Sequence, residues 1–317
     1  MKPAEKPDVL IAYPLRPRFM EELERRYTLH RLDRADDREA VLDKAGPICT
    51  AMVVNGHVAV DGPLLDRLPA LRLAACSSAG FDLMDLDEMT RRGVTLTNTS
   101  VALVDDVADM AILLMLAARR RLVQGDAYVR SGDWGRRGMF PLTTSAAGKR
   151  VGIVGLGNIG LAIATRCGAM GLTIGYSGRN PKRGVDHAYF ADPAALAEWA
   201  DILIVATPGG AGTAGLISAD VLRALGPQGT LVNISRGSVV DEAALIDALR
   251  HGRIAHAGLD VFLNEPHPDP ALTALPNVTL YPHHASGTEE TRDAMAQLTL
   301  DNLDAFFAGK PLLTPVA

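Results

Sequence analysis

Cysteine is scarce in this 317-residue chain, and the spacing of its cysteines excludes a disulfide-stabilised protein and a cysteine-ligated metal protein. Cys49, Cys76 and Cys167 lie far apart among apolar neighbours, so neither a disulfide framework nor a metal-ligand spacing is present. We expect buried free thiols in a reducing compartment, and no metal site.

Long apolar runs and an excess of one charge are also missing. The most apolar stretch, Met110 to Ala118, is far too short to span a bilayer, and the polar segment from Met1 to Pro7 has no apolar signal core. A net charge of −5 does not indicate a nucleic-acid or membrane-surface partner. The sequence therefore predicts a soluble, cytoplasmic protein without either kind of partner.

Apolar residues make up 48% of the chain and charged residues 22%, which is typical of a globular protein and excludes a disordered one. The length suits two domains, each large enough to bury its own core. No internal repeat or low-complexity segment is evident.

Two series of alternating strands and helices are predicted. Strands in the first half are expected at 9–13, 48–54, 71–76 and 94–96, and those in the second at 151–154, 173–176, 202–206, 230–234, 255–259 and 278–281. A nearly all-apolar helix at 104–121 connects the halves, and a last helix at 289–307 can return to the first. This alternation predicts an α/β protein with two Rossmann-like, doubly wound parallel-sheet domains, the substrate domain being discontinuous. The expected limits are 1–100 with 285–317 for the substrate domain and 101–284 for the dinucleotide-binding domain.

A glycine pattern at the start of the second series carries the clearest functional signal. The strand at 151–154 runs directly into Gly155-x-Gly157-x-x-Gly160, and a helical pattern follows. Gly155 permits the tight turn, Gly157 allows close approach of a pyrophosphate, and Gly160 lets the helix pack on the strand. The helix N-terminus offers free N–H groups to the phosphates, so we predict a dinucleotide site.

The end of the next strand bears on the choice of cofactor. An NAD enzyme usually presents an acid there to the ribose hydroxyls, but this chain has Ser177, Gly178 and Arg179. A carboxylate would repel a 2′-phosphate, whereas Ser177 and Arg179 can donate hydrogen bonds to one. We predict a preference for NADP(H), with NAD(H) possible; the alternative is that Arg179 is a solvated loop charge.

Three polar residues follow three consecutive strands of the second series. Arg236 has the guanidinium fork that matches a carboxylate. His283 can exchange a proton near neutral pH, and Glu265 can hold its ring and favour its charged form. Each has a structural alternative: an ion pair, a turn residue and a core histidine. Because strand ends of a parallel sheet meet at one edge, we expect the three to converge; His284 is interpreted as a packing or hydrogen-bonding neighbour.

The chain resembles the D-isomer-specific 2-hydroxyacid dehydrogenase family over nearly its whole length. The resemblance is carried by Val151-Gly-Ile-Val-Gly-Leu-Gly-Asn-Ile-Gly160, Asn233-Ile-Ser-Arg-Gly237, Asn264-Glu-Pro266 and Pro282-His-His-Ala-Ser286. It implies that Arg236 binds the substrate carboxylate and carbonyl, Glu265 orients the histidine, and His283 is the acid/base. It also implies a homodimer built around the nucleotide domains, a hinged substrate domain, and the following dinucleotide-binding residues: Gly155, Leu156, Gly157, Asn158, Ile159, Gly160, Ser177, Gly178, Arg179, Thr207, Pro208, Ile234, Ser235 and Asp260.

Two loops of the first half match the family's substrate-binding loops by position. One contains Asn55, Gly56 and His57, whose backbone N–H groups would hold the substrate carboxylate. The other contains Ser78, Ala79 and Gly80. The family often has a glycine where Ser78 stands, and His57 is unusual there, so the resemblance does not identify the substrate.

The predicted activity is reduction of a small 2-oxo acid to the D-2-hydroxy acid, and Ser177-Gly-Arg179 resembles the NADPH-dependent glyoxylate/hydroxypyruvate and hydroxyphenylpyruvate reductase branch. Phosphoglycerate and phosphite dehydrogenases remain alternatives, whereas the formate branch carries glutamine at the position of Glu265. A non-catalytic, dinucleotide-sensing interaction protein is an alternative of another class. Trp134, Met139 and Phe140 are interpreted as hydrophobic dimer contacts, the alternative being that they line the substrate pocket.

Overall fold

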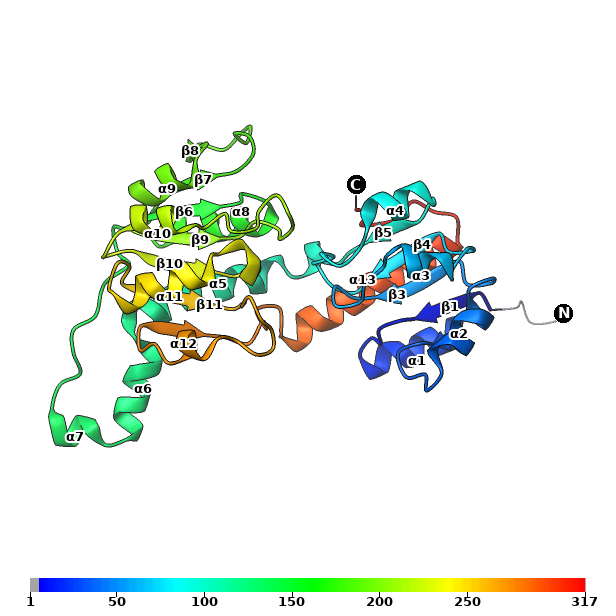
Figure 1. The fold of residues 1–317 in the computed structure, drawn as a ribbon, viewed down its shortest axis with the longest axis horizontal. Helices are drawn as coiled ribbons and strands as arrows, with labels where there is room; N and C mark the ends of the chain where they lie inside the picture. The colour runs from blue at the N-terminus through cyan, green and yellow to red at the C-terminus, as the bar shows by residue number, and fades with distance from the viewer. Residues whose placement is uncertain (1–5, 317) are drawn as a thin grey trace. The chain divides into compact units, whose positions relative to one another are not determined.

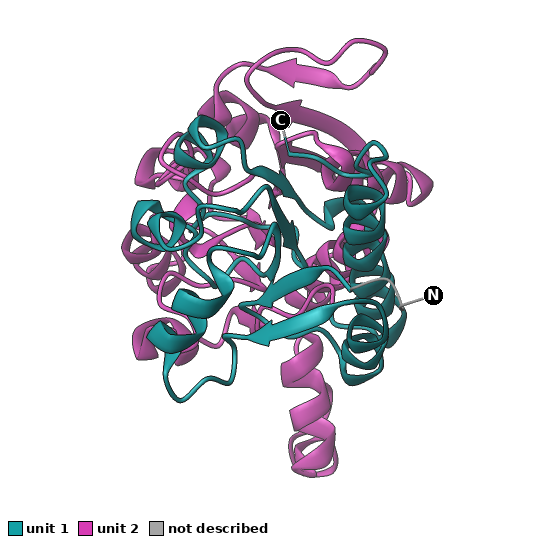
Figure 2. Ribbon diagram, turned by 90° about the vertical axis from the view of Figure 1, so that its right-hand side faces the viewer, with its two compact units in different colours: residues 1–103, 287–317 teal, residues 104–286 magenta. Residues whose placement is uncertain are grey.

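The computed structural model describes residues 6–316, which form two compact units (Figure 2). Unit 1 consists of residues up to Leu103 together with those from Gly287 onward, and unit 2 is Val104–Ser286. Each unit has its own parallel sheet (Figure 1). The expectation of two parallel-sheet α/β domains is confirmed.

Unit 1 is a five-stranded parallel sheet in the order β2-β1-β3-β4-β5. Its strands are β1 (Asp8–Ile11), β2 (Thr28–Arg31), β3 (Ala51–Val54), β4 (Leu73–Cys76) and β5 (Thr95–Thr97). Its helices are α1 (Pro17–Arg26), α2 (Arg38–Ala45), α3 (Gly62–Asp66), α4 (Leu86–Arg91), the 3-10 turn η1 (Ser100–Ala102) and α13 (Glu289–Phe307). Neither β2 nor α2 was expected from the sequence; the edge strand β2 is mostly polar and therefore lacks the apolar pattern of a buried strand.

Alternate residues of the unit 1 strands face two separate apolar layers, as the two-residue period of a strand requires. Val9, Ile11 and Val53 pack with α1 and α13 on one face. Leu10 and Met52 pack on the other face with the buried side chains of α2, α3 and α4. The sheet is therefore covered on both sides, as parallel sheets are.

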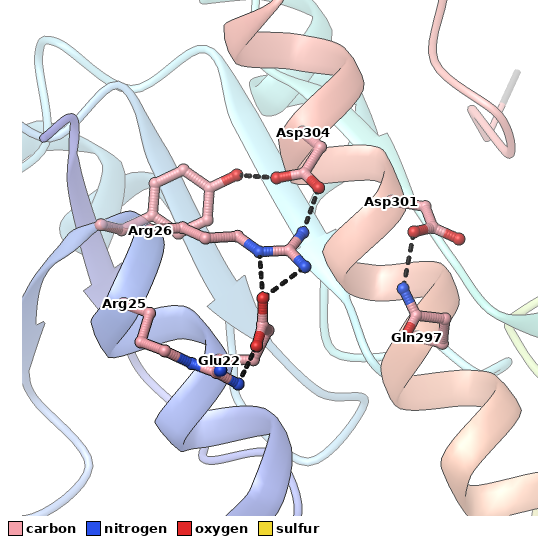
Figure 3. A network of polar contacts seen from close by, with 7 residues as sticks. Glu22, Arg25, Arg26, Gln297, Asp301 and Asp304 are labelled. Atoms are coloured by element: carbon pink, nitrogen blue, oxygen red, sulfur yellow. Dashed lines mark hydrogen bonds and ion pairs between the residues drawn. The ribbon is translucent and has the colours of Figure 1, made fainter.

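Polar contacts tie α13 to α1, although the two helices are far apart in the sequence (Figure 3). The carboxylate of Asp304 accepts the hydroxyl of Tyr27 and pairs with Arg26. The guanidinium of Arg26 also donates from Nε to Oε1 of Glu22 at 2.6 Å. These contacts fix the last helix in the first unit.

Unit 2 is a seven-stranded parallel sheet in the order β12-β11-β10-β9-β6-β7-β8. Its strands are β6 (Arg150–Val154), β7 (Thr173–Ser177), β8 (Ala188–Phe190), β9 (Ile202–Val205), β10 (Thr230–Asn233), β11 (His256–Leu259) and β12 (Val278–Leu280). Its helices are α5 (Val104–Arg120), α6 (Leu122–Arg130), α7 (Asp133–Arg137), α8 (Asn158–Ala169), α9 (Pro193–Trp199), α10 (Ala219–Leu225), the 3-10 turn η2 (Gly237–Val239), α11 (Glu242–Arg250) and α12 (Pro270–Thr273).

The prediction of six strands in this sheet was wrong by one, because the short, half-exposed edge strand β8 has no clear apolar pattern. Strand order reverses between β6 and β9, whose neighbours lead away in opposite directions. Ligands of such sheets bind at the carboxyl ends of the strands beside this reversal. The loops after β6, β7, β9, β10, β11 and β12 therefore matter most for function.

Helix α5 packs on α8, β10 and β11 of the same unit. A Cβ at Gly258 in β11 would lie 2.9 Å from the carbonyl oxygen of Leu114, so only glycine allows this close approach. Beyond α5, helices α6 and α7 extend from the sheet (green, Figure 1), and neither helix was expected from the sequence. Among residues 6–316, no helix combines the length and apolarity needed to cross a membrane. The three cysteines are buried and free, as expected.

Candidate functional site

The glycine loop after β6 has the geometry that a bound dinucleotide requires. Gly155 has φ +96°, and a Cβ at Gly160 would lie 2.2 Å from the carbonyl oxygen of Gly155, so both positions need glycine for the chain's own packing. A Cβ at Gly157 would meet no protein atom within 4 Å. Gly157 is also the N-cap of the twelve-residue helix α8 and offers no side-chain cap to its first N–H groups. The residues present fit a pyrophosphate at this helix N-terminus.

The loop after β7 contains no carboxylate between Tyr176 and Arg183. Ser177 is the last strand residue and only 3% exposed, whereas Arg179 lies exposed beyond it. Lys182, which the sequence analysis did not select, donates from Nζ to the carbonyl oxygen of Leu156 at 2.8 Å. A cation therefore links this loop to the glycine loop.

The turn after β10 is shaped by hydrogen bonds that start from Asn233. Its Oδ1 accepts the N–H of Ser235 at 3.0 Å, and its Nδ2 donates to the carbonyl oxygen of Arg236 at 3.0 Å. The hydroxyl of Ser235 donates to the carbonyl oxygen of Thr207, which joins the turns after β9 and β10. The side chain of Arg236 is half-buried, and its Nη1 donates to the carbonyl oxygen of Ser235 at 2.7 Å.

The loops after β11 and β12 bring Glu265 and His283 into contact. Oε2 of Glu265 lies 2.5 Å from Nδ1 of His283, and Oε1 accepts the N–H of Phe262 at 2.9 Å. Burial acts to raise the pKa of Glu265, but these hydrogen bonds and the charges of His283 and Arg236 outweigh it and lower that pKa. The carboxylate is thereby kept ionised beside Nδ1 of His283.

His283 is held in a backbone conformation that residues with a Cβ rarely adopt. Its φ is +48°, and its N–H donates to the carbonyl oxygen of Asp260 at 2.7 Å. The side chain of Asp260, 1% exposed, accepts the N–H groups of His284 and Ala285 at 2.8 and 3.1 Å. Burial raises the pKa of Asp260, against the lowering effect of those two N–H groups. Asp260, predicted as a dinucleotide-binding residue, thus also braces the loop that carries His283.

Two further residues of this region were missed by the sequence analysis. Glu242, in the first turn of α11, is 8% exposed, and its Oε2 accepts the N–H of Leu263 at 3.0 Å. Asn233 shapes the turn that carries Arg236. No sequence signal marked Glu242, because its burial and its partner Leu263 become evident only in the fold.

The two predicted loops of unit 1 are joined by one hydroxyl group. Oγ of Ser78 accepts the N–H of Gly56 at 2.8 Å and donates to the carbonyl oxygen of Gly80 at 2.9 Å. The N–H of His57 is taken by Oδ1 of Asn55 at 3.0 Å. Among residues 6–316, the N–H groups of the 78–80 loop have no protein acceptor, whereas those of residues 56 and 57 are engaged. The Ser78 hydroxyl therefore ties the two loops together.

A doubly wound sheet with a glycine loop beside its reversal point, and with an arginine and a glutamate–histidine pair at three neighbouring strand ends, is the arrangement of a dinucleotide-dependent oxidoreductase. Comparison with known proteins leads to the same class, that of the dinucleotide-dependent oxidoreductases. Residues 112–285 match the family described as "D-isomer specific 2-hydroxyacid dehydrogenase, NAD binding domain".

The chain is similar over almost its full length to several characterised relatives. It is 44% identical to 2-ketogluconate reductase of Gluconobacter oxydans (99% of each chain) and 45% identical to hydroxyphenylpyruvate reductase of Plectranthus scutellarioides (97% of this chain, 98% of the relative). The crystal structure of an NADPH-dependent glyoxylate/hydroxypyruvate reductase from Sinorhizobium meliloti, in complex with NADP and malonate, superposes with a TM-score of 0.92 at 44% identity, covering 99% and 97% of the two chains. The protein belongs to the D-isomer-specific 2-hydroxyacid dehydrogenase family, and the predicted family and enzyme class are confirmed.

Proposed function

We propose that this protein reduces a small 2-oxo acid, glyoxylate, hydroxypyruvate or a related acid, to the corresponding D-2-hydroxy acid. The observation that carries the proposal is the contact between Glu265 and His283 beside the turn that holds Arg236. A guanidinium fork binds a carboxylate, and a histidine held by a carboxylate can donate a proton to a carbonyl oxygen.

Each of the three residues at the strand ends has its own role in the proposed reaction. Arg236 binds the substrate and stabilises negative charge that develops on the carbonyl oxygen. His283 donates its Nε2 proton to that oxygen, and Glu265 orients the ring through Nδ1. The reduced dinucleotide, when bound, supplies a hydride to the carbonyl carbon. After the transfer, the neutral histidine takes up a new proton from solvent, which completes the cycle.

We propose that unit 1 is the substrate-binding domain and that its 78–80 loop binds the substrate carboxylate. Support comes from the N–H groups of Ser78, Ala79 and Gly80, which have no protein acceptor in the described chain. Consecutive N–H groups of this kind form an anion-binding concavity. In this proposal Asn55, Gly56 and His57 support the shape of that loop.

The proposed cofactor is NADP(H) in preference to NAD(H). The absence of a carboxylate after β7 and the exposed guanidinium of Arg179 support it, and the S. meliloti relative is described as NADPH-dependent. The residues that we assign to the dinucleotide are the glycine loop 155–160, residues 177–179, Thr207 with Pro208, and the turn residues Ile234, Ser235 and Asp260.

A homodimer is proposed as the assembled form. Support comes from large apolar side chains that α6, α7 and the segment after them leave exposed: Leu122, Val123, Val129, Trp134, Met139 and Leu142. Exposed apolar side chains in such numbers on neighbouring elements are typical of association sites. Phe140 instead lies against Tyr128, with ring centroids 5.3 Å apart. The reduced, buried cysteines support a reducing compartment such as the cytoplasm.

The test is to follow NADPH and NADH oxidation with glyoxylate, hydroxypyruvate, 2-ketogluconate and an aryl pyruvate in parallel. We expect turnover of at least one of these acids, faster with NADPH than with NADH. The preferred acid then indicates the size of the substrate pocket. Faster turnover with NADH would overturn only the cofactor preference. No turnover with any acid would overturn the proposed reaction in favour of another family substrate or a dinucleotide sensor. Sedimentation equilibrium of wild type and Trp134→Ala tests the dimer.

A further inference from the structure

We propose that Glu242 is a positioning residue for the acid/base pair, acting through the Phe262–Leu263 peptide segment. The inference rests on the proposed function, because it assigns a role in orienting Glu265 and His283. Glu242 acts at one remove from the pair, because its hydrogen bond is with the backbone N–H of Leu263.

The Phe262–Leu263 segment is held from two sides. Oε2 of Glu242 accepts the N–H of Leu263 at 3.0 Å. From the other side, the turn after β10 presses against the same peptide: a Cβ at Gly237 would lie 1.9 Å from the carbonyl carbon of Phe262 and 2.3 Å from the nitrogen of Leu263. Gly237 directly follows Arg236, so this contact couples the arginine turn to the glutamate loop.

The held segment then supplies the hydrogen bond that orients Glu265. The N–H of Phe262 donates to Oε1 of Glu265 at 2.9 Å, which leaves Oε2 for Nδ1 of His283 at 2.5 Å. Glu242 is thus linked to Glu265 and His283 through three hydrogen bonds and the short stretch of backbone between the N–H groups of Phe262 and Leu263. A carboxylate with one oxygen fixed in this way has less rotational freedom at its other oxygen.

The environment of Glu242 suits a buried hydrogen-bond acceptor. It is 8% exposed and lies in the first turn of α11, where the helix dipole favours negative charge. Burying a charge is costly unless hydrogen bonds compensate it. Leu263 provides such a bond even though its own side chain is 54% exposed, so the contact serves the backbone and not apolar packing.

The test compares Glu242→Ala with Glu242→Gln, which keeps an acceptor oxygen, and with Asp241→Ala as matched control. Asp241 caps the same helix by accepting the N–H of Ala244 at 3.0 Å, so its removal weakens α11 without removing the contact to Leu263. Glu242→Asp, which keeps the charge but is one methylene shorter, serves if Glu242→Ala does not fold.

We expect Glu242→Ala to lower kcat about ten-fold or more, with Kd for NADPH changed by less than about two-fold. Weakening the Phe262 hydrogen bond also raises the pKa of Glu265, so activity is lost at a higher pH on the acid side. Glu242→Gln should restore most of kcat, and Asp241→Ala should lower Tm only. The inference would be overturned if Glu242→Ala and Asp241→Ala lowered kcat equally. It would also be overturned if Glu242→Ala lost activity at the same acidic pH as the wild type.

A second readout separates this inference from the proposed reaction. Carbon NMR of labelled glutamate, assigned with Glu265→Gln, follows the Glu265 carboxyl pKa without any turnover. If wild type reduces no 2-oxo acid but Glu242→Ala raises that pKa, the reaction is wrong and the positioning role stands. If wild type turns over and the Glu265 pKa is equal in wild type and Glu242→Ala, the positioning role is wrong.

Discussion

Nδ1 of His283 lies 2.5 Å from Oε2 of Glu265, and the two residues come from loops that follow neighbouring strands. The histidine backbone has φ +48°, held by an N–H donated to Asp260. Residues kept in such sparsely populated conformations cluster at functional sites, where the surrounding structure stabilises them. The pair is therefore positioned by backbone contacts as well as by its own hydrogen bond.

The pH dependence of activity should reflect the lowered pKa of Glu265. Burial opposes ionisation of this carboxyl, but the His283 and Phe262 hydrogen bonds outweigh burial. Since the folded-state pKa is depressed, the stabilised carboxylate is present above the ordinary glutamate range and is lost as pH falls through the lowered value. His283→Ala removes the larger of the two hydrogen bonds, so the pKa of Glu265 should rise. NMR titration of the Glu265 carboxyl in both proteins checks this; an unchanged or lower pKa in the variant would contradict it.

Removal of either reactive group should affect turnover far more than cofactor binding. We expect Arg236→Ala and His283→Ala to lower kcat/KM by about a hundred-fold or more, since each removes charge stabilisation or proton transfer. Steady-state kinetics together with NADPH titration by fluorescence measure both quantities. Near-wild-type turnover by either variant would refute its assigned role.

Ser78 should affect substrate affinity without affecting cofactor affinity. Its hydroxyl joins Gly56 to Gly80, so Ser78→Ala frees both loops and should raise KM for the 2-oxo acid about five-fold to ten-fold, the value of one hydrogen bond. Ser77→Ala is the matched control, because no described hydrogen bond uses the Ser77 hydroxyl. A KM equal to that of the control would show that the hydroxyl does not shape the loop.

Arg179 and Lys182 should influence the cofactor in different ways. Arg179→Glu places a negative charge where a 2′-phosphate is proposed to bind, so KM for NADPH should rise while KM for NADH changes little. Lys182→Met removes the hydrogen bond to Leu156 in the glycine loop and should weaken the binding of NADPH and NADH to the same extent. Measuring KM for both cofactors in both variants separates these roles; an equal effect of Arg179→Glu on both would argue against a phosphate contact.

Substitutions of Gly157 and Gly160 in the glycine loop should have different effects, one on dinucleotide affinity and the other on the stability of the fold. Gly160→Ala places a Cβ 2.2 Å from the carbonyl oxygen of Gly155 and should destabilise the fold by about 1–3 kcal/mol. Gly157→Ala meets no protein atom within 4 Å, so Tm should hold while dinucleotide affinity falls. Thermal unfolding and cofactor titration test both. A fall in Tm with unchanged affinity in Gly157→Ala would contradict the pyrophosphate assignment.

The sequence by itself determined the fold class and the family, and it predicted the main candidate site residues. Strand-ending motifs such as Gly155-x-Gly157-x-x-Gly160 are local, because the turn, the strand before it and the helix after it are contiguous in the chain. The strand-end positions of Arg236, Glu265 and His283 could be predicted for the same reason. Elements with weak apolar patterns, such as β2, β8 and α6, could not.

Only the tertiary structure decided which polar groups meet. The contact of Glu242 with Leu263 joins residues 21 positions apart, and that of Lys182 with Leu156 joins residues 26 apart, so no local pattern reports them. The hydroxyl of Ser78 is engaged by Gly56 because two parallel strands end side by side. Hydrogen bonds are short and directional, so partners from separate strand ends are defined only when the sheet has set their distances.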